Sequence, residues 1–312
     1  MPINRPGSPR GTVALILAGV ALLVGGASGC ATTPPASAAG RGVRVVAAEG
    51  FWGSLAAQLG GDRASVTSII DRPSLDPHDY EPTAMDGRAL AAARLVIING
   101  AGYDPWATRL VEANPDRRRT TITVGSLVGV PAGGNPHRWY SPSDVRTVVD
   151  EITVAYKRMD PAGAAFFDAR HDAVLTTNLK AYFGLVAEIR TRYAGTPVGA
   201  SESMFSPLAQ ALGLTVLTPA AFLEAISEGS DPTAGDKATV DQQIRNKRIK
   251  VFVYNSQNAT PDVHAAVDEA RAAGIPVSTM TETPSPAGVA FQDWQTAQLL
   301  ALKQALAAAT GA

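Results

Sequence analysis

Two of the four histidines in this chain stand in the same kind of short motif. His78 lies in the sequence Asp-Pro-His-Asp-Tyr, and His137 lies in the sequence Asn-Pro-His-Arg-Trp. The proline before each histidine restricts the backbone, so that the imidazole can be held in one place. Neutral imidazole is the commonest protein ligand of transition metals. The shared setting therefore favours a metal-binding role for both residues over a pair of surface loop histidines.

Two glutamates in the second half of the chain can complete such a site. Glu202 and Glu282 each follow a short apolar segment that is predicted as a strand. A glutamate in such a place is often only a solvated partner of the next helix. Together with His78 and His137, however, the two carboxylates would form a closed site whose two negative charges balance a divalent cation.

The other two histidines have a different setting. His171 lies beside Asp172 in a long helical segment, and His264 comes soon after Pro261 at the start of another. We interpret both as solvated helix residues that take no part in the site.

Short apolar segments alternate with helical segments along most of the chain. This alternation is typical of an α/β fold, in which mostly parallel sheets are covered by helices on both faces. The predicted strands are 43–48, 66–70, 95–99 and 121–124 in the first half, and 198–200, 215–217, 249–254 and 275–279 in the second. The predicted helices are 51–59, 85–93, 105–113, 205–212, 240–247, 262–273 and 291–309.

One long helix is predicted between the two halves, over residues 161–193. Asp160 is a favourable N-cap, and Pro161 is a favourable first helical residue. An apolar stripe then recurs at helical spacing without a further proline, and a helix of this length is about 50 Å long. A break into two helices near Gly163 or Gly184 is the alternative.

A faint internal repeat relates the two halves. Glu49 and the apolar residues after it match Glu202 and the apolar residues after it at one constant offset. The match predicts two similar lobes, 43–160 and 194–312, joined by the long helix. Ligands of parallel sheets bind beyond the carboxyl ends of the strands, so we expect a metal cleft between the lobes.

The first thirty residues have the character of a bacterial export signal. An uncharged apolar run over 11–24 follows a short basic start, and it is too short for a comfortable membrane span. Cys30, the only cysteine, comes directly after small residues and before a tether rich in Pro, Thr and Ala. This stretch is similar to a bacterial lipobox, which predicts a signal peptide over 1–29, a lipid on Cys30 and a flexible tether over 30–42.

Composition excludes several other classes of protein. The formal net charge is −1, with 27 basic and 28 acidic residues, which excludes a nucleic-acid binder held by phosphate neutralisation. A single cysteine allows neither a disulfide within the chain nor a cysteine-based zinc ribbon or iron–sulfur site. We therefore expect no nucleic-acid partner.

These features together resemble the zinc- and manganese-binding solute-binding lipoproteins of bacterial ABC transporters. The resemblance implies two α/β lobes bridged by one long helix, with one divalent metal ion in the cleft. By motif, His78 and His137 are then the ligands from the first lobe, and Glu202 and Glu282 are those from the second. The motifs that carry the resemblance are Asp76-Pro77-His78-Asp79-Tyr80-Glu81-Pro82, Pro136-His137-Arg138-Trp139 and Cys30.

Zinc and manganese both suit this ligand set. Carboxylate oxygens are good ligands for manganese, whereas the general affinity order of divalent ions places zinc above manganese at such a site. The chain has Glu282 and Asn135 where members of the family usually have aspartate, and it has no histidine-rich loop. We favour Zn²⁺ as the cargo and Mn²⁺ as the next candidate.

The resemblance implies an extracytoplasmic receptor that captures the ion and delivers it to an ABC permease for import. A lipid on Cys30 would anchor it at the outer face of the cytoplasmic membrane, and no enzymatic activity is expected. A metallohydrolase that uses the same residues is one alternative, but the common hydrolase motifs are absent from the sequence. A solute-binding protein or surface adhesin for an organic ligand is the other, which an aromatic content of 6% disfavours.

Overall fold

The computed structural model of the chain describes residues 42–73, 80–258 and 260–311. The predicted signal peptide over 1–29, Cys30 and His78 lie outside these residues, so their roles remain predictions. Within the described part of the chain, no helix combines the length and the apolar character that crossing a membrane requires.

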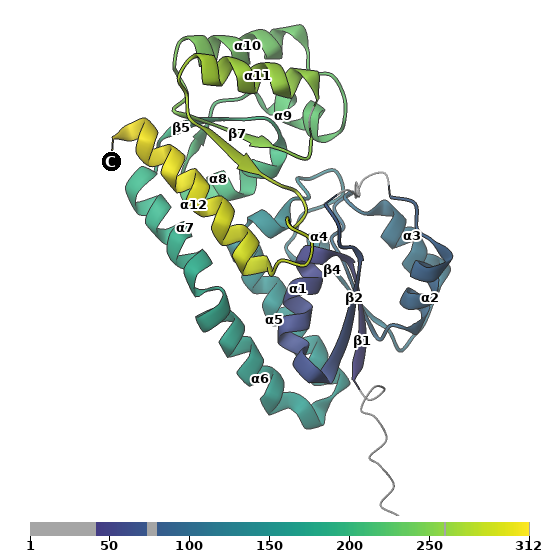
Figure 1. The fold of residues 1–312 in the computed structure, drawn as a ribbon. Helices are drawn as coiled ribbons and strands as arrows, with labels where there is room; N and C mark the ends of the chain where they lie inside the picture. The colour runs from purple at the N-terminus through teal and green to yellow at the C-terminus, as the bar shows by residue number, and fades with distance from the viewer. Residues whose placement is uncertain (1–41, 74–79, 259, 312) are drawn as a thin grey trace, which may run out of the picture. The chain divides into compact units, whose positions relative to one another are not determined.

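The first lobe is built on one parallel sheet of four strands (Figure 1). The strands pair in the order β2-β1-β3-β4, and each neighbouring pair is parallel. Their carboxyl ends therefore lie at one edge of the sheet, where we expect ligands to bind. The strands are β1 (Val43–Glu49), β2 (Ala64–Ile70), β3 (Leu95–Ile98) and β4 (Thr120–Thr123).

Helices cover both faces of this sheet, because successive strand residues point to opposite sides. Val45 and its neighbours on one face belong to the main apolar core, whereas Val46 and its neighbours on the other face belong to a smaller one. The helices on the first face are α1 (Gly50–Gly60) and α5 (Pro142–Met159), and those on the second are α2 (Ala84–Ala92) and α3 (Pro105–Ala113).

The second lobe repeats this arrangement with the strand order β6-β5-β7-β8. In each lobe the first strand along the chain lies between the second and the third, which confirms the predicted fold of two similar α/β lobes. The strands are β5 (Pro197–Ala200), β6 (Thr215–Val216), β7 (Val251–Asn255) and β8 (Val277–Met280). Their helices are α8 (Ser206–Leu212), α9 (Ala220–Ser227), α10 (Ala234–Arg245) and α11 (Pro261–Ala272).

The residues predicted as one linking helix form a helical run whose pitch changes along its length. A 3-10 turn at Pro161–Gly163 leads into α6 (Ala164–Ala173), and a π-helical turn follows at Val174–Asn178. The run is completed by α7 (Lys180–Tyr193), and Gly184 lies inside it without a break. The change of pitch therefore occurs at a π turn, a feature that is rare and often functional in proteins.

The π turn meets two other helices through amide side chains. Asn178 Nδ2 donates to Gln58 Oε1 of α1 over 2.7 Å, and Gln58 Nε2 donates to Gln292 Oε1 over 3.0 Å. Gln292 belongs to α12 (Phe291–Thr310), which lies alongside α7 (Figure 1). Helices from the first lobe, the linking run and the end of the chain are thus joined at one point.

One element that the sequence analysis does not predict is α5, directly after the His137 motif. Ser141 caps this helix by accepting a hydrogen bond from the backbone N–H of Asp144, and Pro142 is its first residue. Buried valine, isoleucine and tyrosine residues recur along it at helical spacing. The helix fixes the end of the loop that carries His137.

The main apolar core runs from one lobe into the other. Tyr140, next to the start of α5, packs against Trp294 of α12 with 5.9 Å between ring centroids. The Tyr140 hydroxyl donates to the carbonyl oxygen of Thr281 over 2.7 Å, just after β8. The described residues accordingly belong to one compact unit, and loops from the two sheets meet in it.

Candidate metal centre

His137 lies in the loop between the short helix α4 (Val124–Leu127), which follows β4, and α5, and it is almost completely buried. It precedes a 3-10 turn at Arg138–Tyr140, and its ring packs at an angle against the rings of Tyr103 and Trp139. Trp139 in turn stacks on Phe51 of α1 with 4.1 Å between ring centroids. This aromatic packing restricts the orientation of the imidazole.

Asn135 determines which nitrogen of His137 carries a proton. Its Oδ1 accepts from the backbone N–H of His137 and lies 3.0 Å from Nδ1. Its Nδ2 donates to the carbonyl oxygen of Ser203 over 2.8 Å, which fixes the orientation of the amide. Nδ1 is therefore the donor to Asn135, and Nε2 faces the other lobe as a possible ligand.

Glu282 meets His137 from the second lobe. It follows β8, and its Oε1 lies 3.0 Å from His137 Nε2. A hydrogen bond between these two atoms requires one shared proton, because a carboxylate oxygen and an imidazole lone pair are both acceptors. Gln257 holds the backbone here, since its Oε1 accepts from the N–H groups of Glu282 and Thr283 over 2.7 and 2.9 Å.

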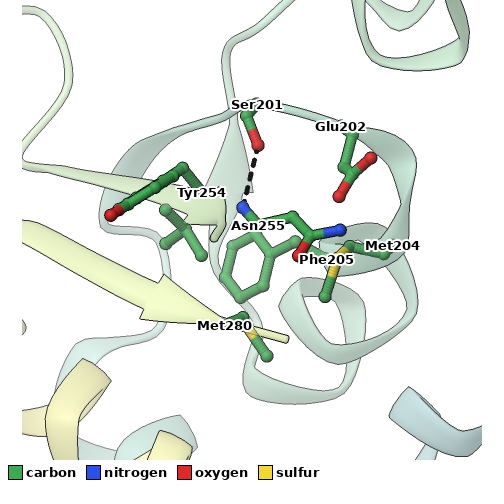
Figure 2. Close-up of a pocket in the computed structure, with 8 residues that line it drawn as sticks. Ser201, Glu202, Met204, Phe205, Tyr254, Asn255 and Met280 are labelled. Carbon is green, nitrogen blue, oxygen red and sulfur yellow. Dashed lines mark hydrogen bonds between the residues drawn. The ribbon is translucent and has the colours of Figure 1, made fainter. Parts of the chain in front are cut away.

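Glu202 lies at the carboxyl end of β5, where it is the N-cap of a 3-10 turn at Ser203–Phe205 and is 3% exposed. Its Oε2 accepts from Asn258 Nδ2 over 3.1 Å. Figure 2 shows the carboxylate beside the amide of Asn255, in a small pocket of the second lobe. The pocket is lined by Ser201, Glu202, Met204, Phe205, Val253, Tyr254, Asn255 and Met280.

The two glutamates act on a common neighbour, Tyr140. Burial raises the pKa of the Tyr140 hydroxyl well above its usual value, and the charges of Glu282 and Glu202 raise it further. Hydrogen bonds to Gln298 and to the carbonyl of Thr281 act in the opposite direction. Glu202 and Glu282 therefore lie in one region of negative potential, which attracts cations.

Three of the four predicted ligands lie among the described residues. His137 and Glu282 are in contact, Glu202 lies in the same region of negative potential, and His78 lies outside the described residues. Among the residues that the structure describes, no three His, Cys, Asp or Glu side chains are gathered closely enough to hold an ion.

The two histidines predicted to be solvated lie away from this region. His264 is exposed on α11, in agreement with the prediction. His171 is half-buried on α6, where Nε2 lies 2.7 Å from Asp150 and Nδ1 lies 3.3 Å from Asp172. It therefore belongs to a surface ion-pair cluster, whereas the sequence analysis predicts a solvated residue.

Two amide residues to which the sequence analysis assigns no role position the site. Asn99 directly follows β3 and is fully buried, and its Oδ1 accepts from Trp52 Nε1 over 3.0 Å. Its Nδ2 donates to the carbonyl oxygen of Pro136 over 2.8 Å, immediately before His137. Gln257 holds the other ligand loop and comes just after β7. Asn99 and Gln257 both follow the third strand of their sheet along the chain, and this shared position could have identified them from the sequence.

Known families and curated proteins were compared with the chain. Residues 45–305 match the family described as zinc-uptake complex component A, periplasmic (ZnuA). The chain is 31% identical over 153 residues to the manganese-binding lipoprotein MntA of Halalkalibacterium halodurans, a match that covers 48% of this chain and 51% of MntA. It is 31% identical over 170 residues to the iron-binding protein YfeA of Yersinia pestis, which covers 51% of this chain and 53% of YfeA. These two matches thus span about half of each relative's length.

Longer matches exist at lower identity. The chain is 24% identical over 274 residues to the manganese ABC transporter substrate-binding lipoprotein PsaA of Streptococcus anginosus, covering 80% of this chain and 83% of PsaA. Among solved structures, the Mn-bound periplasmic metal binding protein from Candidatus Liberibacter asiaticus superposes with a TM-score of 0.70 at 18% identity, covering 84% of this chain and 98% of that one. This structural likeness shows the fold.

Proposed function

Because the chain belongs to the family of periplasmic zinc-uptake component A proteins, we propose that it is a substrate-binding receptor for a divalent transition metal. The receptor captures one ion and delivers it to the permease of an ABC transporter. Relatives named for binding manganese and iron support a metal as the cargo. Those names describe binding proteins, which supports a role in transport and not in catalysis.

The observation that carries this proposal is the contact between His137 and Glu282. Loops from the two lobes bring an imidazole nitrogen and a carboxylate oxygen within 3.0 Å, and both atoms are metal ligands once the shared proton has left. Asn135 occupies Nδ1, so Nε2 is the ligand nitrogen. Glu202, through its neighbouring charge, and His78, through its motif, are the other proposed ligands.

The charges of this ligand set suit a divalent ion. Two neutral imidazoles and two carboxylates bring two negative charges, which balance the charge of the ion in a buried place. A catalytic zinc site keeps one position open for a water molecule, whereas four protein ligands close it. The proposed set therefore supports capture of an ion over hydrolysis.

Zinc is the proposed cargo, and manganese is the second candidate. The family is described by zinc uptake, and the affinity order of divalent ions places zinc above manganese at a site of nitrogen and oxygen ligands. MntA and PsaA are named for manganese, and carboxylate oxygens suit that ion well. We expect both ions to bind and zinc to bind more tightly.

The receptor is proposed to be held at the outer face of the cytoplasmic membrane by a lipid on Cys30. MntA and PsaA are named as lipoproteins, which supports this anchor. Because β1 begins at Val43, the residues 30–42 would form the tether between the lipid and the first strand. Cys30→Ala is expected to move the protein from the membrane fraction to the soluble fraction of the cells that produce it.

A metal titration of the full chain tests the function. The protein is stripped with a chelator and offered zinc or manganese, and the retained metal and the unfolding temperature are measured. We expect one ion per chain and a higher unfolding temperature, because a ligand that binds only the folded state stabilises it. His137→Ala and Glu282→Ala should each lower the affinity at least about tenfold, since even outer-shell partners contribute that much.

His171→Ala is the matched control, because it removes an imidazole that lies outside the proposed site. It should leave the metal affinity unchanged. A wild-type protein that retains neither metal would exclude the receptor function, and an unchanged affinity in His137→Ala would exclude that residue as a ligand.

A further inference from the structure

Two fully buried carboxyl groups face each other at the carboxyl end of the first sheet. Glu49 is the last residue of β1 and the N-cap of α1, whereas Asp104 is the N-cap of α3. Both residues are 0% exposed, and their carboxyl groups lie close enough for each to shift the pKa of the other. Neither belongs to the proposed ligand set, so the pair requires an explanation of its own.

The partners of the two groups show where the proton lies. Asp104 Oδ2 accepts from the N–H of Asn99, and Oδ1 accepts from the N–H of Gly100, each over 2.7 Å. No other described residue donates a hydrogen bond to either oxygen of Glu49. Two carboxylates in buried contact cannot both be ionised. The backbone donors stabilise the charge on Asp104, so the proton resides on Glu49.

Electrostatics agree with this assignment. Burial raises the pKa of Glu49 well above its usual value, and the interaction with Asp104 raises it further. Burial also raises the pKa of Asp104 above its usual value, although the backbone donors and the interaction with Glu49 reduce this rise. Glu49 is thus the neutral acid of the pair and Asp104 the anion.

The Asp104 carboxylate accepts hydrogen bonds at the start of a strained turn over residues 100–102. The φ angles of Gly100, Ala101 and Gly102 are 71°, 55° and 92°, a left-handed run that alanine adopts only at a cost. The hydrogen bonds from the backbone of Asn99 and Gly100 hold the start of this turn in place.

Asn99 connects the turn to the candidate metal centre. While its backbone is held by Asp104, its side chain accepts from Trp52 and donates to the carbonyl oxygen of Pro136. Pro136 immediately precedes His137, so a continuous series of hydrogen bonds runs from Asp104, the neighbour of Glu49, to the loop that carries this imidazole.

We propose that Glu49, as a neutral acid, and Asp104, as a carboxylate, are positioning residues for His137. Loss of either group releases the turn at Asn99, and the loop of His137 then loses a fixed support. The inference rests on the proposed function, because it treats His137 as a metal ligand.

At the equivalent place in the second lobe, a threonine stands where the first lobe has Asp104. Glu202 is the N-cap after β5, as Glu49 is after β1. The helix that follows β7 has Thr260 as its N-cap, where the helix after β3 has Asp104. Threonine brings no carboxyl group to that position.

The test compares the zinc affinities of variants of the full chain. Glu49→Gln should keep the wild-type affinity, because an amide is neutral like the acid and can donate to Asp104. Glu49→Ala should lower the affinity about 10- to 100-fold, the usual effect of losing an outer-shell partner. Asp104→Asn should lower it to a similar degree, because an amide cannot accept both backbone hydrogen bonds as a carboxylate does.

Asp160→Asn is the matched control for a lost carboxylate acceptor, at a partly buried position outside the proposed site. Asp160 accepts from the N–H of Gly163 and pairs with Arg63 at the far end of α5. This variant should unfold at a lower temperature without a change in zinc affinity. Infrared spectroscopy without added metal provides a second readout: the carbonyl band of a buried protonated acid should be present in the wild type and missing in Glu49→Gln.

Several outcomes would overturn the proposal. If Glu49→Gln weakens zinc binding as much as Glu49→Ala, Glu49 acts as an anion. If Glu49→Ala and Asp104→Asn both bind like the wild type, the pair does not position His137. A missing infrared band would disprove the proton on Glu49. If Glu49→Ala fails to fold, the zinc affinities of Glu49→Gln and Asp104→Asn and the infrared band of the wild type still test the proposal. A wild type that binds no zinc contradicts the proposed function instead, and the infrared band still tests the pair.

Discussion

His137 Nε2 and Glu282 Oε1 lie 3.0 Å apart although 145 positions separate the two residues in the chain. Each residue comes from the loop region after the last strand of its own sheet, β4 in the first lobe and β8 in the second. The two lobes therefore contribute equivalent positions to one contact, and they contribute different donor atoms to it. The repeated fold thus brings together a nitrogen and an oxygen from two of the proposed ligands.

Zinc binding is expected to release the proton that His137 and Glu282 share. Because the metal must displace this proton, the affinity should fall as the pH is lowered, by about tenfold per pH unit for one proton. Calorimetry in two buffers with different heats of ionisation measures the number of protons released. In Glu282→Gln an amide replaces the carboxyl group, so that variant should bind zinc more weakly and release fewer protons when zinc binds. Binding heats that do not depend on the buffer would contradict the shared proton.

Gln257→Ala should weaken both the fold and the metal site. The variant leaves the buried N–H groups of Glu282 and Thr283 without their acceptor, which should lower the free energy of unfolding by about 1–3 kcal/mol. The zinc affinity should fall about tenfold, because the loop of Glu282 loses its support. Denaturant unfolding and zinc titration measure the two effects.

Gln243→Ala is the control for this prediction. Gln243 also forms a hydrogen bond to the backbone, from Nε2 to the carbonyl oxygen of Leu217 over 2.7 Å, and this bond joins α10 to the residue after β6. It should reduce stability and leave zinc affinity unchanged. Equal losses of affinity in the two variants would mean that Gln257 has no particular role at the site.

The ion pairs of His171 should stabilise the protein only in mild acid. Partial burial acts to lower the pKa of His171, but its hydrogen bonds to Asp150 and Asp172 and their charges outweigh it, so the pKa is raised. A raised pKa means that this stabilisation is complete below the usual value of 6.5 and is lost as the pH rises through the folded-state value.

His171→Gln should therefore be less stable than the wild type at about pH 5.5 and equal to it at about pH 8.5. Because these groups are partly exposed, we expect a difference of about 0.5–1 kcal/mol at the acid end. Urea unfolding of both proteins at the two pH values measures it. A larger difference in alkali than in acid would reverse the sign and refute the assignment.

Glu49 should make the protein less stable as the pH rises. Its pKa is raised in the folded state by burial and then by Asp104, so above the usual value of 4.5 the unfolded chain loses a proton that the folded protein keeps. The free energy of unfolding should fall with pH through this group by up to about 1.4 kcal/mol per pH unit. Glu49→Gln removes the slope and should gain stability relative to the wild type between about pH 5 and pH 8. If the free energies of unfolding of the wild type and Glu49→Gln change with pH in the same way, the protonated state of Glu49 is contradicted.

The fold could largely be predicted from the sequence because strands buried on both faces leave short continuous apolar segments. The segment predicted as 249–254, for example, is observed as β7 at Val251–Asn255. The helix α5 could have been predicted as well, because its apolar residues recur at helical spacing between the charged residues of its exposed face. The π turn could not be predicted, since Asn178 finds its partner Gln58 at a distance of 120 positions.

The candidate site divides in the same way. His137 could be identified because its motif is local. The roles of Asn99 and Gln257 could not be, because their partners lie 37 and 25 positions away and are determined only by the packing of neighbouring strand ends. His78 and Cys30 lie outside the described residues and remain predictions.

The His137–Glu282 contact also has a consequence for selectivity among abundant ions. Magnesium and calcium prefer oxygen ligands and gain little from an imidazole, whereas zinc binds well to both kinds of atom. An ion that draws little energy from nitrogen would recover less of the cost of breaking this hydrogen bond. If His137 and Glu282 are ligands as proposed, their pairing therefore favours zinc over the commonest divalent ions without an aperture of a particular size.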